Sequence, residues 1–314
     1  MLVASLSLAT VAIVLAWPVP VLLANAHWPR RSPGVALLIW QTIAIAGGLS
    51  MIGSLLTFGL IPFSSSLVRG LLALPPLILS GPLPPGTGLI HIFALSSAFL
   101  LTVHLLLNLV VTAVRSERQR RRHRSLVELL STPLPNRPGT HIIDSPAPVA
   151  YCLPGAHTVT VLSEGLVSLL DADQLEAVIA HERAHLRQQH HAVLLAFQSW
   201  RSALPWFPIA TRAQAAVSLL VELLADDQSR RSTDDHTLAL AISLVGSAET
   251  NTITARPRAD GAAVGEHLMG LSAVSVRVDR LEHPEPQLPL AVRGMIVGIT
   301  LVMLVIPAVL LLTS

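Results

Sequence analysis

Long runs of apolar positions without a charged residue dominate the pattern of the chain. Four of these runs are long enough to cross a bilayer core of about 30 Å at roughly 1.5 Å per helical residue. They predict an integral membrane protein built mainly of α-helices. The four predicted transmembrane helices are residues 2–24, 35–61, 89–114 and 294–313.

The first run also allows another interpretation, a cleaved signal peptide. Such a peptide has a basic start and a shorter apolar core. The sequence has no arginine or lysine before Arg30, so a retained helix is favoured. Residues 62–88, between the second and third runs, are rich in proline and glycine and predict an irregular outer loop.

Two polar residues, His104 and Asn108, lie four positions apart inside the third run. Polar side chains within a membrane helix are candidates for function, here the relay of a signal. Hydrogen bonding between neighbouring helices is the simpler role and is the one we favour.

The arginines predict how the chain is oriented. Arg30 and Arg31 follow the first run, six arginines lie within residues 115–124, and the loop 62–88 contains only Arg69. Basic loops stay on the cytoplasmic side of a membrane. Both basic segments are therefore expected in the cytoplasm, with both chain ends outside. The run at 115–124 is interpreted as an anchor on anionic lipid headgroups, and nucleic-acid binding is the weaker alternative.

This pattern divides the chain into a three-span membrane region at 1–115, a cytoplasmic domain at 116–290 and a fourth transmembrane helix at 291–314. Charged residues make up 13% of the chain, against about 25% in soluble proteins. The single cysteine, Cys152, excludes a disulfide framework and a cysteine-rich zinc site. We interpret it as a small packed residue, so any metal would be held by histidine and carboxylate groups.

Local patterns predict the elements of the cytoplasmic domain. A helix is expected to open at Asp171, which lies three residues before Gln174 in a capping-box arrangement. The other predicted elements are a small β-hairpin at 147–162, a helix on the membrane surface at 192–210, a second helix at about 212–231, and turns with short helical stretches at 250–287.

The predicted helix after Asp171 carries a pattern typical of metal chemistry. His181 and His185 are four residues apart, so both rings project from one face and can bind one zinc ion. Glu182 lies beside the first histidine, where it can act as general base on a water molecule. The alternative is a surface helix whose histidine and glutamate side chains have ordinary partners.

A catalytic zinc site needs a third protein ligand. Glu222 is the best candidate, because an isolated carboxylate on an apolar helix needs a partner. Asp226 follows one helical turn later and can orient a zinc-bound histidine. We expect His190 and His191 to point away from the zinc face into solvent, and His157 to be an ordinary strand residue.

The stretch from Ala150 to His191 resembles the protease segment of the BlaR/MecR family of integral-membrane zinc peptidases. The related HtpX/Ste-type membrane proteases share its hairpin, its His-Glu-x-x-His helix and the later Glu-x-x-x-Asp. The stretch ALPWFP, followed by ELLADD, matches the BlaR/MecR pattern as well, and so does the layout of three helices before the domain and one after it.

The resemblance implies specific roles. His181, His185 and Glu222 would be the zinc ligands, Glu182 the general base and Asp226 a residue that orients a ligand. The strand around 157–161 would be the edge on which a substrate peptide pairs. In the antibiotic sensors a penicillin-binding domain follows the last helix, whereas this sequence stops at Ser314. We therefore do not expect β-lactam sensing by this chain.

The resulting hypothesis is a zinc endopeptidase, embedded in the cell membrane, that cleaves a cytoplasmic protein. A winged-helix repressor of the BlaI/MecI kind is the first candidate substrate, with lipid as a further partner and no direct contact with nucleic acid. The alternatives are a quality-control protease of the HtpX type and a non-catalytic signalling partner with a structural zinc site. The sequence does not predict an oligomeric state.

Overall fold

A computed structural model describes residues 1–134, 139–153, 159–254 and 261–314, with only the backbone described at 77–80, 128, 249–254 and 261–271. The chain forms two compact units. The helical unit comprises residues 1–111, 197–214 and 288–314, and the α/β unit comprises residues 112–196 and 215–287.

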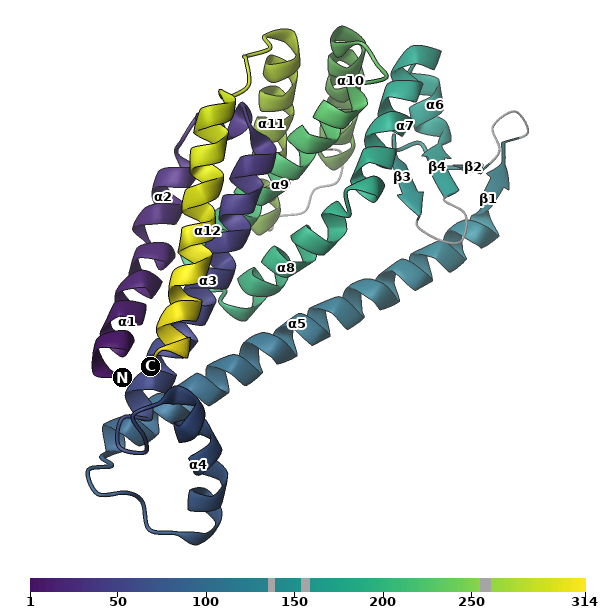
Figure 1. Cartoon of the computed structure of the whole chain (residues 1–314). Helices are drawn as coiled ribbons and strands as arrows, with labels where there is room; N and C mark the ends of the chain where they lie inside the picture. The colour runs from purple at the N-terminus through teal and green to yellow at the C-terminus, as the bar shows by residue number, and fades with distance from the viewer. Residues whose placement is uncertain (135–138, 154–158, 255–260) are drawn as a thin grey trace. The chain divides into compact units, whose positions relative to one another are not determined.

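Long apolar helices make up the helical unit, where α1, α3 and α12 pack side by side (Figure 1). Proline at position 18 restricts the backbone of Trp17, and the first apolar run is broken there into two helices. The elements of this part are α1 (Leu2–Ala16), α2 (Pro18–Ala24), the short 3₁₀ turn η1 (Trp28–Arg30), α3 (Pro33–Gly59), α4 (Leu67–Ser80), α5 (Leu89–Leu130) and α12 (Leu290–Leu312).

Five described helical segments, rather than the four predicted, are long and apolar enough to cross a membrane. Four coincide with the predicted transmembrane helices, and the fifth is α9 (Pro208–Ser229). In the most apolar window of α9, 44% of the residues are buried inside the protein, against 11% for α12. Composition alone does not separate a helix buried in protein from one buried in lipid.

The outer loop predicted at 62–88 is wrong in part, because α4 occupies much of it. Its two prolines, Pro75 and Pro76, lie inside the helix. Each proline removes one backbone N–H donor and crowds the carbonyl group four residues before it, which disfavours a helix but does not exclude one.

The polar pair in α5, His104 and Asn108, forms hydrogen bonds to a neighbouring helix, which is the simpler of its two predicted roles. His104 Nε2 lies 3.0 Å from the carbonyl oxygen of Ala203, and the Asn108 amide donates to Ser202 Oγ at 2.8 Å. Both partners belong to the end of α8 (His190–Ala203) that lies in the helical unit. These hydrogen bonds between helices satisfy polar groups in an apolar setting.

A small sheet of four strands forms one side of the α/β unit. The predicted hairpin is confirmed as the antiparallel pair β3 and β4, while its turn at 154–158 lies outside the described residues. The sheet is larger than predicted, because β4 also pairs in parallel with β2. The strands are β1 (Ser131–Pro133), β2 (Thr140–Ile143), β3 (Ala150–Leu153) and β4 (Val159–Ser163), in the order β1-β2-β4-β3.

Helices cover this sheet and fix the position of α7. The predicted capping box is present, with Asp171 accepting from the Gln174 N–H and the Gln174 side chain accepting from the Asp171 N–H. Ile179 packs with Leu162 and Leu166 in one apolar cluster, while Ala177 packs with Leu238 in another. The helices are α6 (Glu164–Leu169), α7 (Ala172–Arg187), α10 (Asp235–Thr254) and α11 (Gly261–Glu282).

The prediction of turns and short helical stretches at 250–287 is wrong at its C-terminal end. The long helix α11 runs to Glu282 and contacts α10. Leu281 is buried and Val274 and Val278 pack beside it, which is the spacing of one helical face. The proline and glycine residues around this segment concealed that spacing.

Candidate active site

Helix α7 presents the residues of the predicted zinc motif. His181 and His185 are separated by one helical turn, and their Nε2 atoms lie 3.0 Å apart. His181 is buried and His185 is half-buried. The two rings are therefore held together on the inner face of the helix, as the sequence predicts.

Helix α9 brings Glu222 to the two histidines. Its Oε2 lies 3.3 Å from His181 Nε2, and its Oε1 lies 3.5 Å from His185 Nε2. Three ligand atoms bound to one tetrahedral zinc at about 2.0–2.1 Å would lie about 3.3 Å apart. The donor atoms of His181, His185 and Glu222 thus have both the chemistry and the spacing of a zinc site.

Asp226 lies behind His181, as expected for a residue that orients it. Asp226 Oδ1 is 2.9 Å from His181 Nδ1, although the alignment of this contact falls short of a hydrogen bond. Asp226 is almost fully buried. A carboxylate at Nδ1 leaves Nε2 to face the cluster, which is the arrangement that metal-binding histidines commonly use.

Arg277 on α11 is a site residue that the sequence analysis missed. Its guanidinium donates to both oxygens of Asp226, at 2.8 and 2.9 Å, and its Nη1 lies 3.0 Å from Glu222 Oε2. One buried cation therefore balances two carboxylates. The sequence did contain a hint, because Arg277 lies three residues after Val274 and four before Leu281, on the face of the helix that packs in the core.

The electrostatic surroundings set the charge of His181. Burial lowers the pKa of its imidazole, but the contacts with Asp226 and Glu222 outweigh burial and raise the pKa to about 9. Zinc binds the neutral ring, so binding releases a proton from His181. Metal affinity at this cluster consequently depends on pH.

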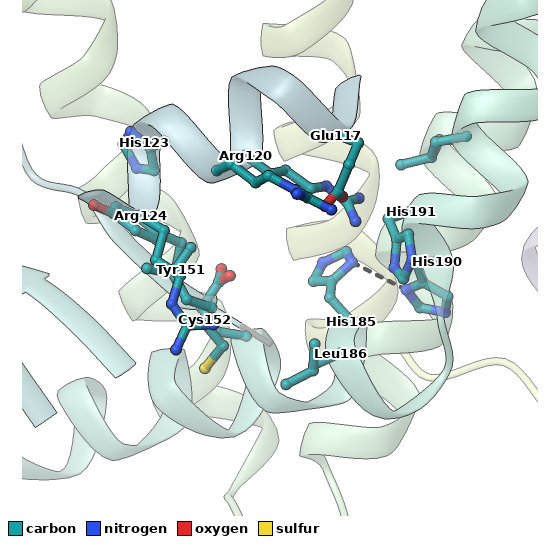
Figure 2. Close-up of a pocket in the computed structure, with 14 residues that line it drawn as sticks. Glu117, Arg120, His123, Arg124, Tyr151, Cys152, His185, Leu186, His190 and His191 are labelled. Atoms are coloured by element: carbon teal, nitrogen blue, oxygen red, sulfur yellow. Dashed lines mark hydrogen bonds and ion pairs between the residues drawn. The ribbon is translucent and has the colours of Figure 1, made fainter. Parts of the chain in front are cut away.

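His190 is buried against the site, so the prediction that it points into solvent is wrong. Helix α7 ends at Arg187, and Gln189 adopts a left-handed backbone with φ of 50° before α8 begins. This break turns the chain, and His190 Nδ1 lies 3.0 Å from His185 Nδ1 (Figure 2). A continuous helix, which the sequence analysis assumed, would have carried His190 away. His191 is exposed, as predicted.

His190 selects the tautomer of His185. Burial, and next the nearby His185, lower the pKa of His190 to about 4, so its ring is neutral at neutral pH. His190 Nε2 lies 2.7 Å from the Gln188 side-chain oxygen and donates its single proton there. Its Nδ1 then accepts from His185 Nδ1–H, which directs His185 Nε2 into the cluster.

Glu182 lines the same cavity as His185 and the β3 residues Tyr151 and Cys152. Burial raises the pKa of its carboxyl group, while His181 and His185 oppose that rise. A carboxylate with a raised pKa is a stronger base than an exposed one. Cys152, which lines the same space, has a pKa raised by burial and is therefore not an activated nucleophile.

The edge of the sheet nearest the cluster is β3, and the expected edge at 157–161 is wrong. β4 is flanked by β2 and β3, so its backbone groups are already paired. β3 is an edge among the described strands and contacts α7. The sequence could not tell which of the two strands lies at the edge of the sheet, because this depends on the pairing of β2 with β4. His157 lies outside the described residues.

Two cavities meet at the cluster, and Glu182 and His185 line both. One has a volume of about 480 Å³ and lies between the end of α5, strand β3 and the junction of α7 with α8 (Figure 2). The other has a volume of about 460 Å³, and apolar residues including Leu238, Ile242 and Val245 line it beside Glu222. A peptide along β3 would pass from one cavity to the other.

Comparison with known proteins agrees with this geometry. Neither the curated proteins nor the solved structures include a match to the chain. Residues 114–246 match the sequence model of a protein family described as Peptidase family M48. This stretch contains the His-Glu-x-x-His helix and Glu222. With a histidine–histidine–glutamate cluster of zinc spacing inside that match, residues 114–246 form a zinc metallopeptidase domain similar to those of family M48.

Proposed function

We propose that this chain is a multi-pass membrane endopeptidase that uses one zinc ion to cleave a cytoplasmic protein in a regulatory pathway. The observation that carries the proposal is the cluster of His181, His185 and Glu222 with Glu182 beside it. A winged-helix repressor of the BlaI/MecI kind is the first candidate substrate, because the motifs at 150–191 and 203–227 resemble the BlaR/MecR pattern.

The proposed roles follow from the contacts of each side chain. His181, His185 and Glu222 hold the zinc ion, which when bound acts as a Lewis acid on a carbonyl and on water. Glu182 accepts a proton from the attacking water and delivers it to the leaving amine. Asp226 and His190 orient the two histidines from behind.

Arg277 has a different role in this proposal, since it holds the carboxylates rather than the histidines. Its contacts with Glu222 and Asp226 keep both carboxylates in one geometry. Two neighbouring carboxylates, one buried and one half-buried, would repel each other without a cation and favour protonation. Arg277 therefore preserves the charged form of Glu222 that zinc binding requires.

The cytoplasmic placement of the site is also a proposal. It rests on two basic segments that are both expected in the cytoplasm: the loop with Arg30 and Arg31, and the arginine-rich segment 115–124. It requires that α9 does not cross the bilayer, and the carboxylates of Glu222 and Asp226 on that helix support this. Four crossings then leave the α/β unit on the cytoplasmic side.

The decisive experiment compares the wild-type chain with Glu182→Gln. The variant should keep its zinc and lose cleavage by about 10²- to 10⁴-fold, because a general base is removed and no ligand is. Glu176→Gln, on the exposed side of the same helix, should keep both properties. Comparing the proteomes of cells that carry each version should reveal a truncated protein, in the first place a transcription regulator, only where Glu182 is intact.

Three results would change the proposal. Full cleavage by Glu182→Gln would contradict the assigned base. A cellular phenotype of gene loss that Glu182→Gln fully rescues would favour the non-catalytic signalling partner. Substrates that are misfolded membrane proteins, with no regulator among them, would favour a quality-control role.

A further inference from the structure

The larger cavity at the active site has a basic wall. Arg120, Arg121 and Arg124 from the end of α5 line it together with Tyr151 and Cys152 of β3. Figure 2 shows Arg120 and Arg124 at this cavity. Glu182 and His185 line the same cavity. The arginines therefore face the space that a peptide on the edge strand would occupy next to the reacting bond.

The spacing of these arginines is that of one helical face. Positions 117 and 120, 117 and 121, 120 and 124, and 121 and 124 are three or four residues apart, which places all four on one face of the helix. The row has three arginines and one acid, Glu117, which accepts from Arg121 at 2.7 Å. These four side chains, three arginines and one glutamate, together have a net charge of +2, and all four line the cavity.

A ring contact fixes this face against the sheet. His123 packs on Tyr151 with ring centroids 4.9 Å apart. Tyr151 belongs to the edge strand, so α5 is held beside the strand that would pair with substrate. The cavity is therefore a built feature of the α/β unit.

The other cavity is of opposite character. Besides the site residues, its wall is formed by aliphatic side chains such as Leu166, Leu238 and Ile242. Glu182 and His185 line both cavities, while residues 148–150 line the apolar cavity and residues 151–153 line the basic one. The two cavities therefore follow one another along the edge strand, on either side of the reacting position. The structure thus offers a peptide a basic environment on one side of the scissile bond and an apolar one on the other.

We propose that the arginine face of α5 selects substrates with acidic side chains on one side of the scissile bond. The inference rests on the proposed peptidase function and adds the class of substrate. A bilayer surface also attracts arginine, but it is planar and cannot enter a cavity of about 480 Å³ that ends at Glu182. An acidic peptide segment on β3 would lie in the cavity that all three arginines line.

The test measures cleavage by the full-length, zinc-loaded chain in non-ionic detergent. The probes are peptides that differ only in having Asp, Asn or Lys on one side of a fixed apolar site. The wild-type chain should prefer the Asp peptide to the Asn peptide by roughly tenfold in kcat/KM, from two or three partly exposed charge contacts. Rising salt should erase this preference.

Charge reversal supplies the matched variants. Arg120→Glu with Arg124→Glu should invert the preference toward the Lys peptide. Arg118→Glu with Arg122→Glu makes the same change in net charge at exposed positions of the same helix that do not line the cavity. This control should retain the preference of the wild type.

Several outcomes would overturn the inference. One is an equal rate on all three peptides, which would leave the peptidase function intact. A second is a change in preference that is equal in the two charge-reversed variants. A third is an unchanged preference in both variants together with impaired membrane integration. Either result would assign the arginines to the anionic membrane surface.

A binding measurement separates the two proposals. Glu182→Gln should bind the Asp peptide more tightly than the Asn peptide, whether or not the wild type cleaves either. Equal binding would overturn the acidic selectivity. Tighter binding of the Asp peptide without cleavage by the wild type would instead contradict the proposed peptidase function.

Discussion

Helices α9 and α12 have similar lengths, and both are apolar enough to span a bilayer, yet they lie in different surroundings. On α12, large apolar side chains such as Met295, Leu301 and Val305 are more than half exposed. On α9, Val217 and Val221 are fully buried within the protein. The hydrophobic pattern reports how much apolar surface a helix must hide, but not whether protein or lipid hides it.

The polar groups of the two helices follow the same difference. α9 carries Glu222 and Asp226 one turn apart, and each has partners on α7 and α11. The buried polar group of α12, Thr300, bonds within its own helix to the carbonyl of Ile296. A carboxylate is tolerated on α9 because the fold supplies histidine and arginine partners, which lipid cannot.

The largest expected effect comes from placing a charge on each helix. Val217→Arg should destabilise the α/β unit by more than about 4 kcal/mol, because a buried guanidinium has no partner there. Leu301→Arg should instead weaken membrane insertion of α12 by about 2.5–3.5 kcal/mol. The zinc content of Val217→Arg measures the loss of the folded α/β unit. The accessibility of the C-terminus of Leu301→Arg to protease measures the loss of membrane insertion. If Val217→Arg disturbs insertion and leaves zinc binding intact, α9 is a transmembrane helix.

The next effect removes the cation that makes the carboxylates of α9 tolerable. Arg277→Leu should lower the free energy of unfolding by about 3–5 kcal/mol, because it leaves Asp226 buried without its main partner. Arg280→Leu is the matched control. Asp227, the partner of Arg280, is partly exposed and keeps a contact with Arg230, so a loss near 1 kcal/mol is expected. Hydrogen exchange of α7 and α9 measures both, and equal losses would argue against a special role for Arg277.

A smaller effect concerns the histidine behind the cluster. His190→Ala should weaken zinc binding by about 10- to 100-fold, because His185 loses the contact that fixes its tautomer. His191→Ala, at the exposed neighbouring position, should leave zinc affinity unchanged. Competition with a chelator measures both variants. Unchanged affinity in His190→Ala would show that α7 and α9 orient His185 without help.

The smallest effect is the pH dependence of the site. The pKa of His181 is raised from 6.5 to about 9 in the folded chain. In the chelator-treated chain, its protonated ring stabilises the fold fully below about pH 6.5, and this contribution is lost as the pH rises toward 9. Zinc affinity should change in the opposite direction, rising up to about tenfold per pH unit over the same window. Asp226→Asn should flatten both profiles, and an unaltered slope in that variant would contradict the role of Asp226.

Local sequence signals predicted much of the site. The capping box at Asp171 placed the start of α7, and the spacing of His181 and His185 placed two rings on one face. Glu222 stood out as an isolated acid on an apolar helix. Each of these inferences depends on neighbours within one or two helical turns, where helix geometry is fixed.

The residues that were misjudged depend on contacts over longer distances. His190 was predicted in solvent because a single left-handed residue, Gln189, was not foreseen. Arg277 was missed because its partners are about 50 residues away. The substrate edge was assigned to β4 because the pairing of β2 with β4 has no local pattern.

The sequence by itself determined that this protein has helices long and apolar enough to span a bilayer, and one helix with two histidines spaced to bind zinc. Those properties follow from composition and from the 3.6-residue period, which act locally. Only the tertiary structure showed that one face of α9 packs in protein, that Arg277 contacts its carboxylates, and that arginines of α5 line a cavity with Glu182. These features arise when distant segments exclude water together, so the chain must fold before they exist.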